Sequence, residues 1–326
     1  MTAEPLSLTL LALVAVAVVL DLVIGDPRGL PHPVVGMGRV IAWLERAWNR
    51  GSPRARQGKG AIMALLVVMG VYLLAWGLLT WLAWLHPLLA LVAEIGLLAS
   101  ALAIKGLQDA AREVARPLAS GDLPGARRAL GMIVGRDTAA LDEGEITRGA
   151  VETVAENSVD GVTAPLFWAL LGGAPLALAY KAINTLDSMV GYRNERYGDF
   201  GWASARLDDL ANWVPARLTA LAMWLAAFMI PGAGTRGALA STWREAPRHA
   251  SPNSGWPEAM MANLMGVQVG GTNHYAGVAY HRATLGRPLA ALEVRHIALS
   301  IRHLHGTWLL FVLLMALMIV VKEGLA

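Results

Sequence analysis

Residues 61–93 read AIMALLVVMGVYLLAWGLLTWLAWLHPLLALVA, and this stretch decides the fold class. It contains no Asp, Glu, Lys or Arg. About 20 mainly apolar residues cross a bilayer, because roughly 30 Å of hydrocarbon is covered at about 1.5 Å per residue. His86-Pro87 interrupts the stretch, and proline breaks a helix. Together with the apolar run on to Ile104, the stretch predicts a helical hairpin of two membrane spans.

The composition of the whole chain indicates the same class. Of 326 residues, 56% are apolar and 16% are charged. A soluble domain is about 45–50% apolar and about 25% charged. Twelve Trp stand against four Phe, and Trp favours the interface between a bilayer and water. We therefore expect an integral membrane protein whose surroundings are the lipid bilayer.

Several classes of protein are excluded or disfavoured. The chain has no cysteine, so it contains no disulfide framework, thiolate metal site or cysteine nucleophile. The net charge of +3 is too small and too scattered for a nucleic-acid surface. The apolar N-terminus from Pro5 to Gly25 lacks a basic leading region, so we expect a retained membrane helix rather than a signal peptide.

The pattern predicts an all-α fold, with one polytopic membrane domain over residues 1–326. We expect about 4–6 transmembrane or re-entrant helices, joined by helical cytoplasmic loops. The expected spans lie near residues 5–25, 61–85, 87–104, 212–232 and 304–321. Residues 165–183 are a further candidate, interrupted by Gly172-Gly173-Ala174-Pro175. Irregular backbone survives at membrane depth only where protein or a cavity covers it, so this segment is either a span or re-entrant.

Basic residues predict the orientation. The segment between the first two spans is rich in them, which places it in the cytoplasm and the N-terminus outside. Its members are Arg28, Arg39, Arg46, Arg50, Arg54, Arg56 and Lys59. The hairpin then returns residues 105–160 to the cytoplasm, and the arginine-rich residues 236–302 are expected there as well.

Acidic residues form a stripe in residues 134–160, VGRDTAALDEGEITRGAVETVAENSVD. Asp142, Glu145, Glu152 and Glu156 are spaced by three, seven and four, so a helix places them on one face. A solvated surface helix is the ordinary explanation. Here, however, the stripe runs directly into an uncharged segment, so its end lies near membrane or a buried cleft. Such carboxylates suit Mg²⁺, which prefers oxygen ligands.

A second cluster occupies residues 181–212, KAINTLDSMVGYRNERYGDFGWASARLDDLAN. Its many acidic and basic residues stand between two apolar segments. Part of it is explained by ordinary ion pairs of a juxtamembrane loop, but ionisable residues at membrane depth are costly and mark functional sites. Lys and Arg contact phosphates, and paired Asp residues hold metal ions.

Two further features of the sequence give weaker evidence for a functional site. His32 stands between Pro31 and Pro33, which restrict its backbone, although a lone histidine is more often structural. The polar segments 252–258 and 270–275 contain glycine, and they are either phosphate-binding loops or tight turns.

Together these segments resemble the adenosylcobinamide-phosphate synthase (CobD/CbiB) family over essentially the whole chain. The matching motifs are DLVIGDP and LPHP within 21–33, VGRDT and LD within 134–142, ETVAENSVDGVTAPLF at 152–167, AYKAINTLDSMVGYRNERYGDFGWASARLDD at 179–209, SPNSGWPEA at 251–259 and the Val269-Gly270-Gly271 loop.

The resemblance implies ligation of (R)-1-amino-2-propanol, or its O-phosphate, to a propionate carboxylate of adenosylcobyric acid, with consumption of ATP and help from Mg²⁺. It also implies an inner-membrane enzyme, with late cobalamin-pathway enzymes as candidate partners. Because ATP is cytoplasmic, the active site is expected there, which favours a broken or re-entrant segment at 165–183. The expected catalytic residues are Asp187, Lys181 and Glu152; the cofactor-binding residues are Arg136, Arg193, Arg196, Arg206, Asn184 and His32; and the metal ligands are Glu156, Asp160, Asp208 and Asp209.

Two other classes stay open at this point. A membrane sensor or regulator would not need a dense site of acids and bases. A corrinoid transporter would use broken helices and an intramembrane Asp21, but it gives no reason for so many cytoplasmic carboxylates. ATP consumption that requires both cobyric acid and the amine would separate the ligase from both.

Overall fold

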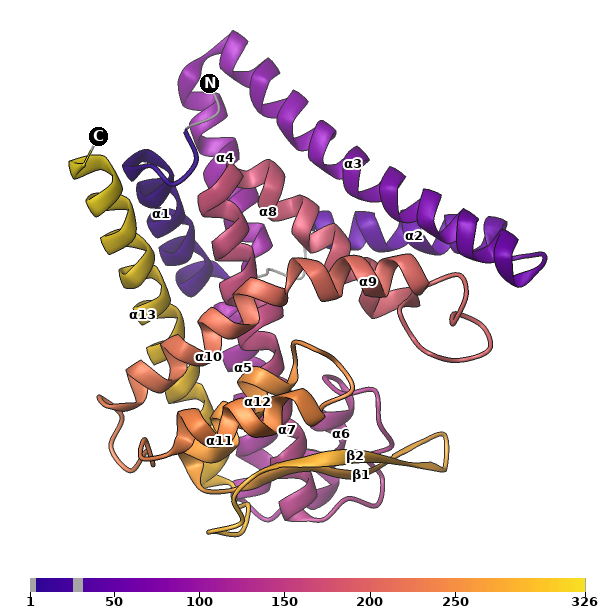
Figure 1. Cartoon of the computed structure of the whole chain (residues 1–326), viewed down its shortest axis with the longest axis vertical. Coiled ribbons are helices and arrows are strands. Elements are labelled where there is room, and N and C mark those ends of the chain that lie inside the picture. Colours follow the sequence, from indigo (N-terminus) through magenta and orange to yellow (C-terminus); the bar gives the residue numbers. More distant parts are fainter. Residues whose placement is uncertain (1–3, 26–31, 326) are drawn as a thin grey trace. The chain divides into compact units, whose positions relative to one another are not determined.

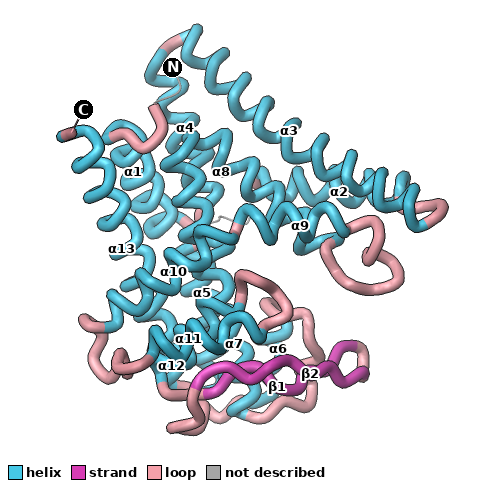
Figure 2. Tube along the Cα trace, in the orientation of Figure 1, coloured by secondary structure: helices cyan, strands magenta, loops and turns pink. Residues whose placement is uncertain are grey.

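The computed structural model describes residues 4–25 and 32–325, and it is mostly helical (Figures 1 and 2). The predicted all-α membrane fold is confirmed. In the described part, the strands are limited to one antiparallel hairpin. Residues 26–31 of the motif at 21–33 lie outside the described residues.

The contacts of the chain divide it into two compact units. The first unit consists of Met1–Ile104, Ala164–Asn212 and Ala316–Ala326, and the second of Lys105–Thr163 and Trp213–Met315. The single membrane domain over residues 1–326 stays a prediction.

The first unit is built around one helix, α8 (Ala164–Val190). The helices that pack against α8 are α1 (Leu8–Ile24), α2 (Pro33–Trp48), α3 (Pro53–Leu85), α4 (Pro87–Ala101) and α9 (Trp202–Ala211). Buried leucine, alanine and valine side chains form the interior of this unit. Burial of such side chains is the main stabilising term for the packing.

The starts of these helices follow from local sequence. The Ser52 side chain accepts a hydrogen bond from the Ala55 amide at the start of α3, and Pro53 occupies the first turn. His86 ends α3 and caps α4, which begins at Pro87. A proline in the first turn loses no helical hydrogen bond, whereas it cannot continue the preceding helix. The predicted break at His86-Pro87 is confirmed.

Helix α8 is broken in the middle, as the sequence predicts. Gly172 and Gly173 have non-helical backbone, and Gly173 has φ of 65°. A Cβ at Gly173 would approach a carboxylate oxygen of Glu94 to 2.5 Å. The glycine is therefore required both by the backbone and by the close approach of α4.

The second unit consists of helices and one β-hairpin. Its elements are α5 (Ile104–Ala119, from Lys105 on), α6 (Leu123–Gly131), α7 (Glu143–Ser158), the π-helical turn η1 (Val159–Thr163), α10 (Trp213–Ala227), α11 (Ala238–Glu245), the 3₁₀ turn η2 (Ala246–Arg248), α12 (Gly255–Met265), β1 (Gln268–Tyr275), β2 (Val278–Gly286) and most of α13 (Arg295–Gly324). Every residue of α12 is buried. It packs against α7, α10, α11 and both strands.

The hairpin is the element that the sequence did not predict. Tyr275 pairs with Val278 across a two-residue turn in which Ala276 and Gly277 both have positive φ, the conformation of a type I′ hairpin turn. The ladder is irregular between Val269 and Gly271. The Gly270-Gly271 segment, expected to be a loop, is thus part of a strand.

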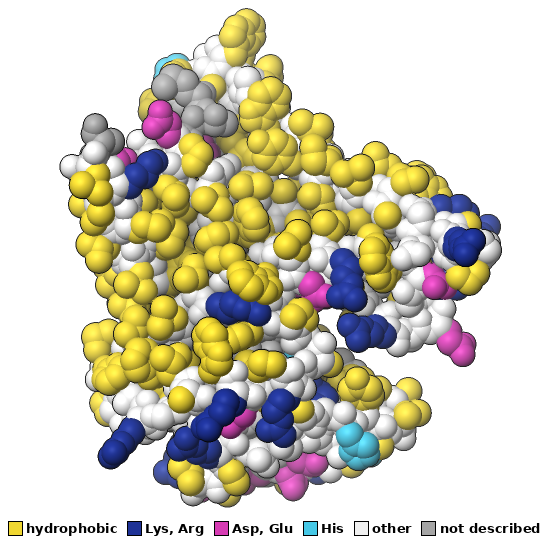
Figure 3. Space-filling view, in the orientation of Figure 1, with side chains coloured by type: hydrophobic (Ala, Val, Ile, Leu, Met, Phe, Trp, Pro, Cys, Tyr) yellow, Lys and Arg dark blue, Asp and Glu magenta, His cyan; other side chains and the backbone are white. Residues whose placement is uncertain are grey.

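Four helical stretches among residues 4–25 and 32–325 are long and apolar enough to cross a membrane: Pro53–Leu85, Pro87–Ala119, Glu143–Val190 and Arg295–Gly324. Helix α1 is apolar but shorter, with 17 residues, and α10, inside the expected span at 212–232, has 15. Hydrophobic side chains cover the exposed face of α3 (Figure 3). The chain is a membrane protein.

Candidate functional site

Two carboxylates, Asp187 near the end of α8 and Asp208 in α9, lie close together in the first unit. The two Asp208 oxygens accept hydrogen bonds from the side-chain amides of Asn184, at 3.5 Å, and Asn212, at 3.1 Å. The Tyr180 hydroxyl in turn donates to Asn212 over 2.8 Å. The carboxylate of Asp208 is therefore held in position by neutral groups.

Electrostatics make Asp208 unusual. Burial raises the pKa of its carboxyl to about 7, and the negative charge of Asp187 contributes in the same direction. The Asn212 and Asn184 amides oppose the shift by stabilising the charged form. Two carboxylates that repel each other at neutral pH form a natural place for a cation or a shared proton.

The segment between α8 and α9 and one face of α9 line a cavity of about 630 Å³. In the sequence, the lining residues begin shortly after Asp187 and end at Asp209, next to Asp208. Three predicted site residues line it together: Arg193, Arg206 and Asp209. Arg206 and Asp209 form an ion pair at 3.3 Å. The remaining lining residues are Gly191, Tyr192, Asn194, Glu195, Tyr197, Gly198, Gly201, Trp202 and Ala205. The cavity thus combines guanidinium groups with aromatic faces.

Contacts far apart in the sequence hold this segment to α2 and α3. The Arg196 guanidinium donates to both carboxylate oxygens of Glu45 at 3.1 Å. Arg56 donates to the Glu195 and Arg196 carbonyls at 2.9 and 2.7 Å. Arg196, predicted to contact phosphate, is therefore engaged by Glu45, whereas Arg193 and Arg206 face the cavity.

Two other predicted site residues of the first unit, Lys181 and His32, are not among the residues that line the cavity. Lys181 is half-buried and lies nearly two turns before Asp187 on α8. His32 caps α2, because its Nδ1 accepts a hydrogen bond from the Val34 amide at 3.2 Å. In the structure the His32 ring therefore caps the N-terminus of α2.

In the second unit, Arg136 and Glu152 form a buried ion pair at 2.6 Å, with each side chain 5% exposed. Arg136 also donates to the Asn273 side chain. The other carboxylate oxygen of Glu152 accepts from the Gly270 amide at 2.8 Å. These two predicted site residues thus hold strand β1 against α7.

The acidic residues of the stripe at 142–160 have different roles in the structure. Asp142 and Glu145 form a capping box that starts α7, which explains their spacing of three. Glu156 accepts a hydrogen bond from the Ser254 hydroxyl at 3.1 Å. Asp160 is half-buried in the π-helical turn η1, and such turns often occur at functional sites.

One buried cluster was missed by the sequence reasoning. Glu258 of α12, which is 1% exposed, binds Arg282 of β2 at 3.0 Å, and Arg282 also contacts His249. Burial raises the pKa of Glu258, while Arg282 opposes this, and burial lowers the pKa of His249 to about 4. Glu152 and Glu156 act electrostatically on Arg282 and Glu258. The only signal in the sequence was Glu258 within the polar segment 252–258.

The four predicted metal ligands are distributed over both units: Glu156 and Asp160 in the second, Asp208 and Asp209 in the first. Within the described residues, no group of three or more His, Asp or Glu side chains is arranged to hold a metal ion. Among the four, Asp208 has Asp187 as a neighbouring carboxylate, and the two act on each other electrostatically.

Comparison with known proteins agrees with the sequence motifs. The family model described as CobD/Cbib protein matches residues 14–304. A cobalamin biosynthesis protein CobD of Halalkalibacterium halodurans is 52% identical over 93% of this chain and 94% of its own length. The CobD protein of Geobacter metallireducens is 51% identical over 94% of this chain and 96% of its own, and the CbiB protein of Salmonella typhimurium is 44% identical over 95% and 97%. No solved structure matches the chain. The chain therefore belongs to the CobD/CbiB family, and its role is in cobalamin biosynthesis.

Proposed function

We propose that the protein is an adenosylcobinamide-phosphate synthase. It joins (R)-1-amino-2-propanol, or its O-phosphate, to a propionate carboxylate of adenosylcobyric acid and consumes ATP. Membership of the CobD/CbiB family gives the pathway. The observation that carries the chemistry is the arginine-lined cavity between α8 and α9, next in sequence to the pair Asp187 and Asp208.

The reaction requires activation because a carboxylate is a poor acyl donor. In the first step, an oxygen of the propionate attacks the γ-phosphorus of ATP, and ADP leaves. In the second step, the amine nitrogen attacks the acyl carbon of the acyl phosphate, phosphate leaves, and the nitrogen loses one proton to a base. Both steps depend on positioning the reactants and stabilising charge on transferred oxygens.

The residues of the first unit are suited to these needs. Arg193 and Arg206 bind the phosphates from the wall of the cavity. Asp187 and Asp208 would hold a Mg²⁺ ion, and such an ion would supply positive charge to offset that of the triphosphate. The raised pKa of Asp208 supports this assignment, because a nearby cation would relieve the repulsion between the two carboxylates. Lys181, on the same helix as Asp187, adds positive charge for an anionic substrate.

We further propose that the protein lies in the inner membrane with this cavity open to the cytoplasm, where ATP is present. The break in α8 at Gly172 and Gly173 supports this orientation. A broken helix need not cross the whole bilayer, so the cavity that follows it need not lie on the periplasmic side.

The test is a product assay on purified protein in detergent, with adenosylcobyric acid, Mg-ATP and either amine. Wild type should give an amidated corrinoid together with ADP and phosphate, and the preferred amine identifies the substrate. Asp187→Ala should reduce the rate by about 100-fold or more, as loss of a charge-stabilising group does in other enzymes. The exposed Glu143→Ala is the control and should retain activity. No product from folded protein with either amine would refute the proposal.

A further inference from the structure

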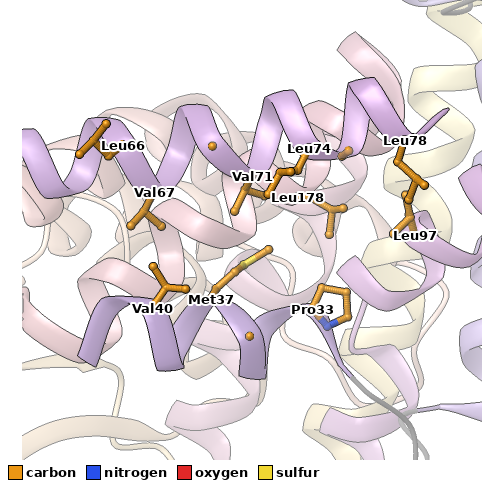
Figure 4. Close-up of a pocket in the computed structure, with 13 residues that line it drawn as sticks. Pro33, Met37, Val40, Leu66, Val67, Val71, Leu74, Leu78, Leu97 and Leu178 are labelled. Atoms are coloured by element: carbon orange, nitrogen blue, oxygen red, sulfur yellow. The ribbon is translucent and has the colours of Figure 1, made fainter. Parts of the chain in front are cut away.

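An apolar groove runs between α2 and α3 in the first unit (Figure 4). Its volume is about 390 Å³. Helix α4 and helix α8 add one residue each to its walls. The α2 wall runs from Pro33 to Val40 and the α3 wall from Leu66 to Leu78, with Leu97 and Leu178 as the residues from α4 and α8. None of the described side chains that line the groove carries a hydrogen-bonding group, so the groove suits a purely hydrocarbon occupant.

Three of the four helices that line the groove, α3, α4 and α8, belong to stretches long and apolar enough to cross a bilayer, and on this ground we place the groove at membrane depth. From Leu66 to Leu78 the lining extends over 13 residues of α3, and the 12 steps between them cover about 18 Å at about 1.5 Å per residue. Half of a hydrocarbon core of roughly 30 Å is about 15 Å. The groove is therefore as long as one leaflet is deep.

Glycine keeps the groove open. An added Cβ at Gly36 or at Gly70 would meet no atom within 4 Å. These two positions lie on facing walls, one on α2 and one on α3. A larger side chain at either position would extend into the groove without displacing backbone.

Helix α2 carries exposed basic residues beside and beyond Val40, the last of its groove-lining residues. Arg39, Trp43 and Arg46 follow one another on α2 at spacings of four and three, so they share a face, and all three are exposed. Arg39 is next to Val40, which lines the groove. Lys and Arg side chains gather where α3 begins (Figure 3). Exposed Trp and Arg at the end of an apolar face are typical of the headgroup level of a bilayer.

We propose that this groove is a binding site for an anionic phospholipid of the surrounding bilayer. One acyl chain lies between α2 and α3, and the phosphate of the headgroup lies on Arg39 and Arg46 with Trp43 beside it. The charge of the arginines selects an anionic lipid over a zwitterionic one. The site does not depend on the ligase activity.

The experiment is native mass spectrometry of the full chain released from nanodiscs of equimolar phosphatidylglycerol and phosphatidylcholine. Phosphatidylglycerol should be the retained lipid. Arg39→Gln and Arg46→Gln should each weaken its retention by about fivefold, the effect of one basic residue near an anionic surface. Gly70→Leu should remove the retained lipid by filling the groove.

Gly77→Leu is the matched control, because Gly77 lies on the same helix, has no atom within 4 Å of its added Cβ and does not line the groove. It should retain phosphatidylglycerol as wild type does. If Gly70→Leu lowers the melting temperature relative to Gly77→Leu, Gly36→Leu on the facing wall repeats the test. Equal lipid retention by the Gly70, Gly36 and Gly77 variants, or equal retention of the two lipids by wild type, would overturn the proposal.

Discussion

Asp208 shows how one residue couples the candidate site to the stability of the protein. An aspartate in an unfolded chain ionises near pH 3.9, whereas burial and Asp187 raise the pKa of Asp208 to about 7 in the folded protein. Between about pH 4 and pH 7 the folded protein therefore keeps a proton that the unfolded chain has lost. The contribution of Asp208 to stability falls as the pH rises through this window.

We predict that Asp187→Asn makes this fall shallower, because removing the neighbouring charge lowers the pKa of Asp208. The measurement is the apparent melting temperature of the detergent-solubilised protein from pH 4 to pH 8. Glu143→Gln, an exposed carboxylate on α7, is the control and should leave the profile unchanged. An unchanged profile in Asp187→Asn would mean that the two carboxylates do not interact.

A second prediction at the residue scale concerns Arg282. Replacing Arg282 with Met leaves Glu258 buried without its cationic partner, and breaking such a pair costs about 3–5 kcal/mol. The double variant Arg282→Met with Glu258→Met should recover much of this loss, because no buried charge then lacks a partner. Hydrogen exchange of the β1 and β2 amides measures the loss of stability in the single variant and its recovery in the double variant. A double variant as unstable as the single one would show that the charge pair is not the cause.

At the scale of elements, close packing of α3 positions the segment that forms the cavity. A Cβ on Gly60 would overlap the backbone of Phe200, just before α9. The segment can approach α3 this closely only because position 60 is glycine. On the other side, a Cβ on Gly201 would overlap the carbonyl oxygen of Val190 at the end of α8.

We therefore predict that Gly60→Ala destabilises the protein by about 1–3 kcal/mol, the usual cost of overpacking, and lowers the proposed ligase activity. Gly58→Ala serves as the control, since its Cβ would meet no atom within 4 Å and it lies two residues away on the same helix, on the opposite face. Apparent melting temperature and product formation are measured on both variants. Equal behaviour of the two would show that the cavity does not depend on this contact.

Elements were predictable where the signal is local. The break at His86-Pro87 and the interruption at Gly172-Gly173 follow from proline and glycine themselves. Strands β1 and β2 were not predicted from the sequence, because side chains distant in the sequence help to hold them in place. Arg148 donates to the carbonyls of Gly270 and Thr272, and the Asp137 carboxylate accepts from the amides of Ala276 and Gly277.

At the scale of the whole molecule, the distribution of basic residues predicts which ends of the spans face the cytoplasm. Because the natural chain has no cysteine, single cysteines report this directly. Arg54→Cys at the start of α3 and Asn194→Cys in the cavity segment should react with an impermeant maleimide only after the membrane is opened. His86→Cys, at the turn between α3 and α4, should react in intact spheroplasts. Labelling of Asn194→Cys in intact spheroplasts would place the cavity outside and contradict the proposal that it binds cytoplasmic ATP.

The sequence by itself determined the membrane class, the all-α fold, the main apolar helices and the family, because hydropathy, helix-breaking residues and long motifs are all read along the chain. Its density of charged residues also singled out residues 181–209, which include the residues that line the cavity and both Asp187 and Asp208. Only the tertiary structure decided which charged groups are engaged: Arg196 with Glu45, Arg136 with Glu152, and Arg282 with Glu258. The physical reason is that the two members of each pair are separated by many residues in the sequence. Their pairing therefore depends on how helices and strands pack, and no local pattern reveals it.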